Sequence, residues 1–201
     1  MRGTNGVKRI FRRTAVVLIA LAVAFVSFGW FERKRNEQEE YRVYSAYLSE
    51  GLLNDAHDWS IGGPVQVIIS DRTIAYGNLR FRLFSLFDRR VDFREMQTST
   101  RASYLARNLF RTHIESKFSL PTRAIACVTP EGEYSSPSFQ EKFPSNMGLV
   151  VLSGVGFNPS KTQAVFYINH FCGLCGSGRY VLMEKIGGAW RVRDEHYTWI
   201  S

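Results

Sequence analysis

Two closely spaced cysteines are the residues of this chain with the clearest chemical potential. Cys172 and Cys175 lie three residues apart in the run HFCGLCGSG, which begins at His170. Two thiols at this spacing can form a small disulfide ring, exchange disulfides with another dithiol, or bind a metal. Outside the cytoplasm the disulfide is favoured, so the role of the pair depends on where the chain resides.

The residues after the pair bear on redox catalysis. In thioredoxin-type sites the N-terminus of a following helix lowers the pKa of the first cysteine. Here Gly176, Ser177 and Gly178 follow, and then the run YVLMEK, which is typical of a strand. We therefore expect a structural disulfide or paired thiols in a glycine-rich loop. Redox catalysis by Cys172 and Cys175 is the alternative, and no catalytic residue is assigned.

A metal site would need at least three protein ligands. His170, Cys172 and Cys175 could supply them, with Cys127 or His196 as a fourth, but the second cysteine pair common in zinc sites is absent. We therefore expect no metal and no cofactor, and keep these residues as weaker metal candidates. Cys127, the odd thiol, is expected either as a small buried residue in a strand or cross-linked to one of the pair.

An apolar segment near the N-terminus predicts a membrane location. Residues 14–31 read TAVVLIALAVAFVSFGWF, carry no charge and have basic residues on both sides. A helix of eighteen residues covers about 27 Å, close to the roughly 30 Å hydrocarbon core of a bilayer. Small-x-small triplets such as Ala22-Val23-Ala24 lie inside the run, which ends in bulky aromatic residues. These features favour an uncleaved signal anchor over a cleaved signal peptide.

The flanking charges predict a single pass with the N-terminus inside the cell. Residues 1–13 form a basic cytoplasmic tail, residues 14–31 contact the lipid bilayer, and the rest of the chain is extracytoplasmic. We divide that remainder into a juxtamembrane amphipathic helix, residues 32–60, and an α+β domain, residues 61–201. The expected fold class is thus α+β, a helix plus an antiparallel meander behind a transmembrane helix.

The net charge of +8 would ordinarily suggest nucleic acid, but the basic residues gather at one end. Residues 1–35 hold eight basic residues and one acidic residue, whereas the rest of the chain holds 18 basic and 17 acidic residues. A nearly neutral body offers no surface suited to a polyphosphate. We therefore expect no nucleic acid, and an envelope protein or a small ligand as the partner.

Hydrophobic periodicity predicts the first elements. Tyr41, Tyr44, Leu48 and Leu52 recur at helical spacing, which indicates one amphipathic helix. The β-branched run at 65–70 and the alternating run at 79–83 indicate strands, and the run RAIACVT at 123–129, around Cys127, indicates a further one. Asp92 and Glu95 have the spacing of a capping box ahead of a helix whose better part is 101–110.

The last third of the chain predicts an antiparallel meander, residues 148–200. Four strand-like runs, 149–157, 163–171, 179–186 and 189–200, are separated by turn residues, and Gly187-Gly188 is a tight-hairpin signal. In the last run, alternation is expected to place Trp190, Val192 and Ile200 on the core face and Arg191, Arg193 and Glu195 on the other.

Several short motifs in this region resemble a group of uncharacterised exported or membrane-anchored bacterial proteins. The motifs are SGVGFN at 153–158, CGLCGSGRY at 172–180, Gly188-x-Trp190 and the closing WIS. The resemblance implies an exported location and a shared fold, and it transfers no catalytic residue. A weaker likeness is to cystatin-like and nuclear-transport-factor-like α+β folds.

Two functions from different classes remain open at this level. The first is a membrane-anchored, non-enzymatic binding or envelope-associated domain, since the sequence holds no nucleophile-elbow, zincin or P-loop motif. The second is a membrane-tethered thiol-disulfide oxidoreductase that uses Cys172 and Cys175.

Overall fold

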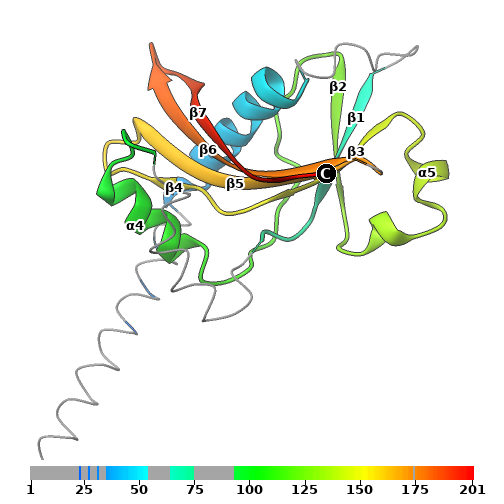
Figure 1. Ribbon diagram of the computed structural model, residues 1–201, viewed down its shortest axis with the longest axis horizontal. Coiled ribbons are helices and arrows are strands. Elements are labelled where there is room, and N and C mark those ends of the chain that lie inside the picture. The colour runs from blue at the N-terminus through cyan, green and yellow to red at the C-terminus, as the bar shows by residue number, and fades with distance from the viewer. Residues whose placement is uncertain are drawn as a thin grey trace, which may run out of the picture.

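Helices lie on both faces of one mixed sheet (Figure 1). The computed structural model describes residues 35–53, 64–74, 93–173 and 175–201, together with positions 23, 27 and 31. The predicted tail and membrane segment, residues 1–31, lie outside the described residues except at those three positions, as does the strand predicted at 79–83. No helix within the described residues is long and apolar enough to cross a bilayer.

The described part of the sheet runs in the order β2-β1-β3-β5-β6-β7, and a short strand, β4, pairs with β5. The strands are β1 (Val65–Ser70), β2 (Ala124–Thr129), β3 (Asn146–Leu152), β4 (Gly156–Phe157), β5 (Gln163–Phe171), β6 (Gly176–Ile186) and β7 (Ala189–Ile200). β1 is parallel to both of its neighbours, whereas β3, β5, β6 and β7 pair antiparallel in succession. The α+β class is confirmed in this coarse form.

The predicted meander forms the part of the sheet made by β5, β6 and β7. Gly187 and Gly188 join the last two strands with φ angles of 59° and 85°, the left-handed conformation that a two-residue hairpin turn requires. The run 149–157 is not one strand, contrary to prediction, but divides into β3 and β4. The reason is that the N–H of Gly154 donates to the Asn108 side chain at 2.7 Å and that of Val155 to Glu40 at 2.9 Å.

The N-terminal helix packs on one face of the sheet (Figure 1). Residues 35–47 are helical and continue into a π-helical turn, η1 (Leu48–Leu52). The predicted apolar stripe is confirmed, because Tyr41, Tyr44, Leu48 and Leu52 are all 9% exposed or less. Burying each such side chain contributes roughly 1.5 to 3 kcal/mol, which makes this helix–sheet contact the main core.

The helix α4 (Thr98–Arg107) packs on the opposite face. The predicted capping box is wrong for Glu95, which lies ahead of the helix, while Asp92 falls outside the described residues. The acceptor for the helix start comes from β5: the Gln163 side-chain oxygen accepts the N–H of Gln97 at 2.8 Å and the hydroxyl of Thr100 at 3.0 Å. A tertiary contact thus replaces the local cap.

Two register shifts between β6 and β7 change which side chains face the N-terminal helix. Trp190 and Val192 face the core as predicted. After the first shift Glu195 also turns toward the helix, where it accepts the Tyr47 hydroxyl at 2.7 Å. The prediction that Glu195 shares a face with Arg191 and Arg193 is therefore wrong, because a bulge inverts the alternation.

Candidate functional site

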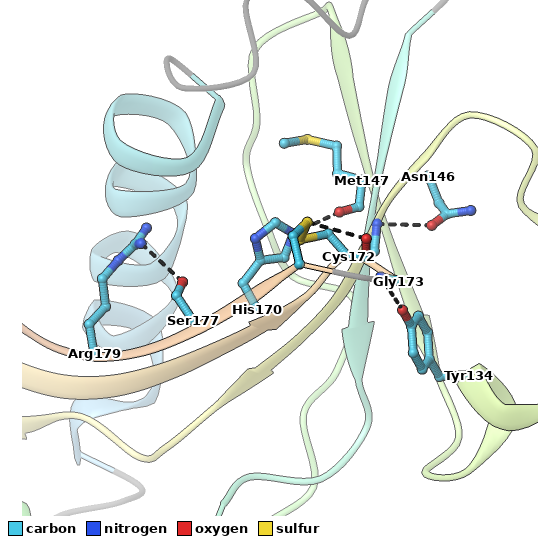
Figure 2. Close-up of a disulfide and its surroundings, with 10 residues drawn as sticks. Tyr134, Asn146, Met147, His170, Cys172, Gly173, Ser177 and Arg179 are labelled. Atoms are coloured by element: carbon cyan, nitrogen blue, oxygen red, sulfur yellow. Dashed lines mark hydrogen bonds between the residues drawn. A yellow bond between two sulfur atoms is a disulfide. The ribbon is translucent and has the colours of Figure 1, made fainter. Parts of the chain in front are cut away.

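Cys172 and Cys175 form a disulfide at the tip of the β5–β6 hairpin (Figure 2). Their Cα atoms are 5.0 Å apart, and the N–H of Cys172 donates to the carbonyl oxygen of Cys175 at 2.9 Å. Cys175 is exposed and Cys172 is half-buried. The predicted pairing is confirmed, and the loop is closed by a covalent bond and a hydrogen bond together.

A tyrosine from a distant segment holds this loop in place. Between β2 and β3 the chain forms a 3-10 turn, η3 (Glu133–Ser135), and a short helix, α5 (Phe139–Lys142). The Tyr134 hydroxyl accepts the N–H of Gly173 at 2.9 Å (Figure 2), and its ring packs edge-on against buried Phe139 at 4.9 Å. The hairpin tip is therefore docked onto the segment that carries α5.

The glycines after the disulfide belong to β6 and make room for an aromatic ring. A Cβ on Gly178 would come within 2.0 Å of the indole nitrogen of Trp199, and a Cβ on Gly176 within 3.0 Å of the same ring. The indole N–H is shared between the Tyr167 hydroxyl at 3.2 Å and Asn169 Oδ1 at 3.1 Å. A strand follows the cysteines, so no helix N-terminus lies there to lower a thiol pKa.

His170 is a structural residue of β5. Its Nε2 lies 2.6 Å from the Met147 carbonyl oxygen (Figure 2), which can only accept, so this nitrogen carries the proton. Burial lowers the pKa of His170, and the bond to Met147 does not restore it. The ring is therefore neutral at physiological pH and links β5 to the start of β3.

The candidates for a fourth metal ligand lie apart from this loop. Cys127 is a free thiol on β2, beside Ile68 of β1. His196 is exposed on β7, on the opposite face of the sheet from His170. Within the part of the chain that the structure describes, no three His, Cys, Asp or Glu side chains converge as metal ligands. Cross-linking of Cys127 to the pair is wrong, because Cys172 and Cys175 bond to one another.

A buried carboxylate ties the N-terminal helix to α4 and to the segment before β4. Glu40 is 5% exposed, and the Arg107 guanidinium lies 3.2 and 2.9 Å from its two oxygens. The Tyr44 hydroxyl and the Val155 N–H donate to the same carboxylate at 2.8 and 2.9 Å. Burial alone would lower the pKa of Arg107, but the Glu40 carboxylate raises it, so the guanidinium stays charged. The cavity beside the pair holds about 10 Å³, which leaves no room for a substrate.

A second buried cation, Arg179 of β6, lies between two tyrosine rings. Its guanidinium carbon is 5.7 Å from the Tyr47 ring centre and 5.0 Å from that of Tyr197. Its Nε donates to the Tyr47 hydroxyl at 2.6 Å and lies 3.1 Å from the Glu195 carboxylate. Burial raises the pKa of Tyr47, which stays a neutral phenol. Both buried cations thus have their charge balanced inside the protein.

An open groove runs along the outer side of the N-terminal helix. It has a volume of about 790 Å³ and lies between residues 117–119 and the β6–β7 turn. Tyr41, Ala46 and Trp190 give it a buried or half-buried apolar lining, and Arg42 and Lys117 are exposed along it. This combination of apolar surface and accessible charge suits the binding of a ligand.

One wall of the groove is fixed by an ionised carboxylate. Glu39 contacts the Lys185 ammonium and accepts the indole N–H of Trp190 at 2.8 Å and a guanidinium N–H of Arg42 at 3.2 Å. Burial raises the pKa of Glu39, but the hydrogen bonds from Lys185 and Trp190 outweigh burial and lower it. Trp190 is therefore held in a defined orientation beneath the groove.

Sequence reasoning missed the residues of the groove and of the Glu40 network. The charged run 32–40 is typical of a solvated helix face, yet Glu40 is buried at its end. One signal was present, because Glu40 lies four residues before Tyr44 and thus on the same helix face as the predicted apolar stripe. The groove is formed by segments far apart in the chain, so no local sequence pattern could predict it.

Comparison with known proteins gives no match for this chain: no family model, no curated protein and no solved structure resembles it. The likeness of its C-terminal motifs to exported bacterial proteins therefore stays a prediction, and what the chain does must follow from its own residues.

Proposed function

We propose that this chain is a non-enzymatic binding domain, held at the extracytoplasmic side of a membrane by residues 14–31, which binds an extended polypeptide of an envelope protein. The groove along the N-terminal helix is the observation that carries this proposal. Its lining runs from Glu37 to Ser49, about 18 Å along a helix axis. Five to six residues of an extended chain would fill that length, at roughly 3.3 Å each.

The lining also indicates the chemistry of the partner. Half-buried Ala46 and the exposed edges of the largely buried Tyr41 and Trp190 rings offer apolar surface to an apolar side chain. Arg42 is 61% exposed and, among the residues that the structure describes, pairs only with Glu39, so it can also bind an acidic residue of the partner. Lys117 is already bound at 2.8 Å by Glu37 and by Glu115 and is expected to contribute less. The favoured ligand is an extended segment with an apolar residue next to an acidic one.

Filling the groove should abolish binding. Ala46→Trp places an indole where the partner would lie, whereas Ala102→Trp adds the same side chain at an exposed position of α4. With a photo-crosslinking amino acid at Gln38, we expect a defined envelope-protein adduct in intact cells. Ala46→Trp should reduce the adduct about tenfold or more, the effect of roughly 1.4 kcal/mol in binding, and Ala102→Trp should leave it unchanged. Equal adducts in both variants would contradict the proposal.

The membrane location has a test of its own. Protease added to intact spheroplasts should digest the body of the protein, residues 36 onward, and leave a short fragment with the membrane. A variant lacking residues 1–31 should not sediment with membranes. Protection of the body until the cells are lysed would show that the orientation is wrong.

Thiol-disulfide exchange is the second candidate function, and the exposure of Cys175 favours it, because an attacking thiolate can reach that sulfur. The docking of the loop through Tyr134 and the strand after it favour a structural bond instead. Titration against glutathione distinguishes the two. We expect a potential below about −300 mV, as for structural disulfides, and a value near −200 mV would favour the enzyme.

A further inference from the structure

The two outer strands of the described part of the sheet are protected very differently. β7 carries four charged side chains between Arg191 and Glu195 and two register shifts, and both features discourage pairing with another strand. β2, at the other edge, reads AIACVT, with no charge and no proline, and it pairs with β1 over six successive residues without a bulge. Ile125 on this strand is 48% exposed. Such a flat, uncharged edge is suited to pairing.

The hydrogen bonds of the β1–β2 ladder show which backbone groups are free. The N–H of Val65 donates to Arg123 O, and that of Asp71 to Thr129 O, both at 2.8 Å. In a parallel ladder the odd-numbered residues of β2 therefore face β1. The N–H and C=O groups of Ala126 and Val128 point away from the sheet, and no hydrogen bond reaches them from the residues that the structure describes.

We propose that this edge binds a second copy of the chain, with the two β2 strands antiparallel about a two-fold axis at residue 127. In that register Ala126 lies opposite the second copy's Val128, and the outward groups of these residues form four hydrogen bonds. The two sheets then continue into one another across the interface. Because the axis is perpendicular to the sheet, both N-terminal helices lie on the same side.

The free backbone groups of β2 permit more than one antiparallel register, and the charges of Arg123 and Glu131 favour this one. Arg123 immediately precedes β2 and has no ion pair within the described residues, whereas Glu131 follows the end of the strand and is 56% exposed. With the axis at residue 127, Arg123 of each copy lies beside Glu131 of the other. Glu131 keeps its contact with Arg111 at 2.6 Å, so the second arginine completes an exposed cluster. Opposite charges facing each other across strands stabilise the pairing.

The same register places the odd thiol on the axis. Cys127 and the second copy's Cys127 form a non-hydrogen-bonded pair, whose Cα atoms are about 4.5 Å apart in antiparallel sheets. That separation lies within the range that a disulfide tolerates, roughly 4.4 to 6.8 Å. Shifting the axis to residue 126 or 128 would instead bring Cys127 opposite position 125 or 129. A disulfide between the two Cys127 residues would therefore form only in the register with the axis at residue 127.

The experiment is oxidative cross-linking of the full chain in detergent micelles with copper phenanthroline, which removes the two thiol protons and two electrons. We expect a reducible dimer joined at residue 127 and its loss in Cys127→Ser. A matched control, Cys127→Ser with Ser116→Cys, places an exposed thiol off the interface and gives the collisional background. A dimer yield no higher than that background would overturn the proposal.

Exchanging the charges at positions 123 and 131 tests the register and distinguishes a lost interface from a misfolded protein. Arg123→Glu or Glu131→Arg alone should weaken dimerisation about tenfold, because each creates two like-charged pairs. The double variant should restore it, which a merely unfolded protein could not do. In the Cys127→Ser background, sedimentation velocity should show the same pattern without any cross-link. A monomer at every concentration, or a double variant no better than the single ones, would overturn the pairing while leaving the groove proposal untouched.

Discussion

Replacing Trp190 with alanine should lower the free energy of unfolding by about 3 to 5 kcal/mol, the range for large aromatic truncations in cores. Trp190 is 4% exposed, packs 5.9 Å from the Phe157 ring and donates its indole N–H to Glu39 at 2.8 Å. The truncation removes these contacts and opens a cavity between β7, β4 and the N-terminal helix. Urea unfolding followed by far-ultraviolet circular dichroism measures the loss.

Two further variants separate the ring from its hydrogen bond. Trp190→Phe keeps most of the apolar area and removes the N–H donor, so a loss of about 1 to 2 kcal/mol is expected. Ile186→Ala, at a position that is 60% exposed at the end of β6, should change stability by less than about 0.5 kcal/mol. A loss below about 1 kcal/mol for Trp190→Ala would show that the side chain is not a core residue.

Neutralising Glu40 is the second change with a large expected effect. Glu40→Gln removes the carboxylate that is hydrogen-bonded to the Arg107 guanidinium, whose side chain is 8% exposed. Removing one partner of a buried ion pair costs about 3 to 5 kcal/mol, since the remaining charge stays desolvated. The same urea titration should report this loss, with the whole transition shifted to lower denaturant.

Two comparisons make this result specific to the buried charge. The double variant Glu40→Leu with Arg107→Met should recover part of the loss, because no unpaired charge is then buried. The recovery stays partial, since the Val155 N–H still lacks its acceptor, whereas the Tyr44 hydroxyl keeps the Ser153 carbonyl oxygen at 2.6 Å. Arg193→Gln disrupts an exposed pair with Glu95 and should leave the urea midpoint unchanged. A double variant less stable than Glu40→Gln would contradict this account.

Local patterns predicted the elements whose cause is local. The Gly187-Gly188 turn specifies a hairpin through its φ angles alone, and the helical stripe from Tyr41 to Leu52 needs only one apolar face. The disulfide was predictable for the same reason, because two cysteines three residues apart find one another wherever the loop lies. In each case the residues that determine the structure lie within a dozen positions of one another.

The rest could not be read locally, because its cause lies elsewhere in the chain. The start of α4 is satisfied by Gln163, more than sixty residues away, so the local Asp-x-x-Glu pattern misled. Glu195 faces inward because a bulge shifts the register of β7, and a period-two pattern has no means of showing one. The groove depends on the β6–β7 turn lying beside the N-terminal helix, which is a property of the assembled fold.

The parallel pairing of β1 has a consequence for how the chain is made. Its partners β2 and β3 lie far downstream, so Val65–Ser70 cannot be paired on both edges until residues up to Leu152 have been synthesised. At 5 to 20 residues per second, that delay is roughly 4 to 16 s for some eighty residues. Throughout it, the run VQVIIS, whose apolar side chains end up almost entirely buried, lacks at least one of its two partner strands. A nascent chain of this protein therefore needs a chaperone or a translocation channel to shield that segment until the second half arrives.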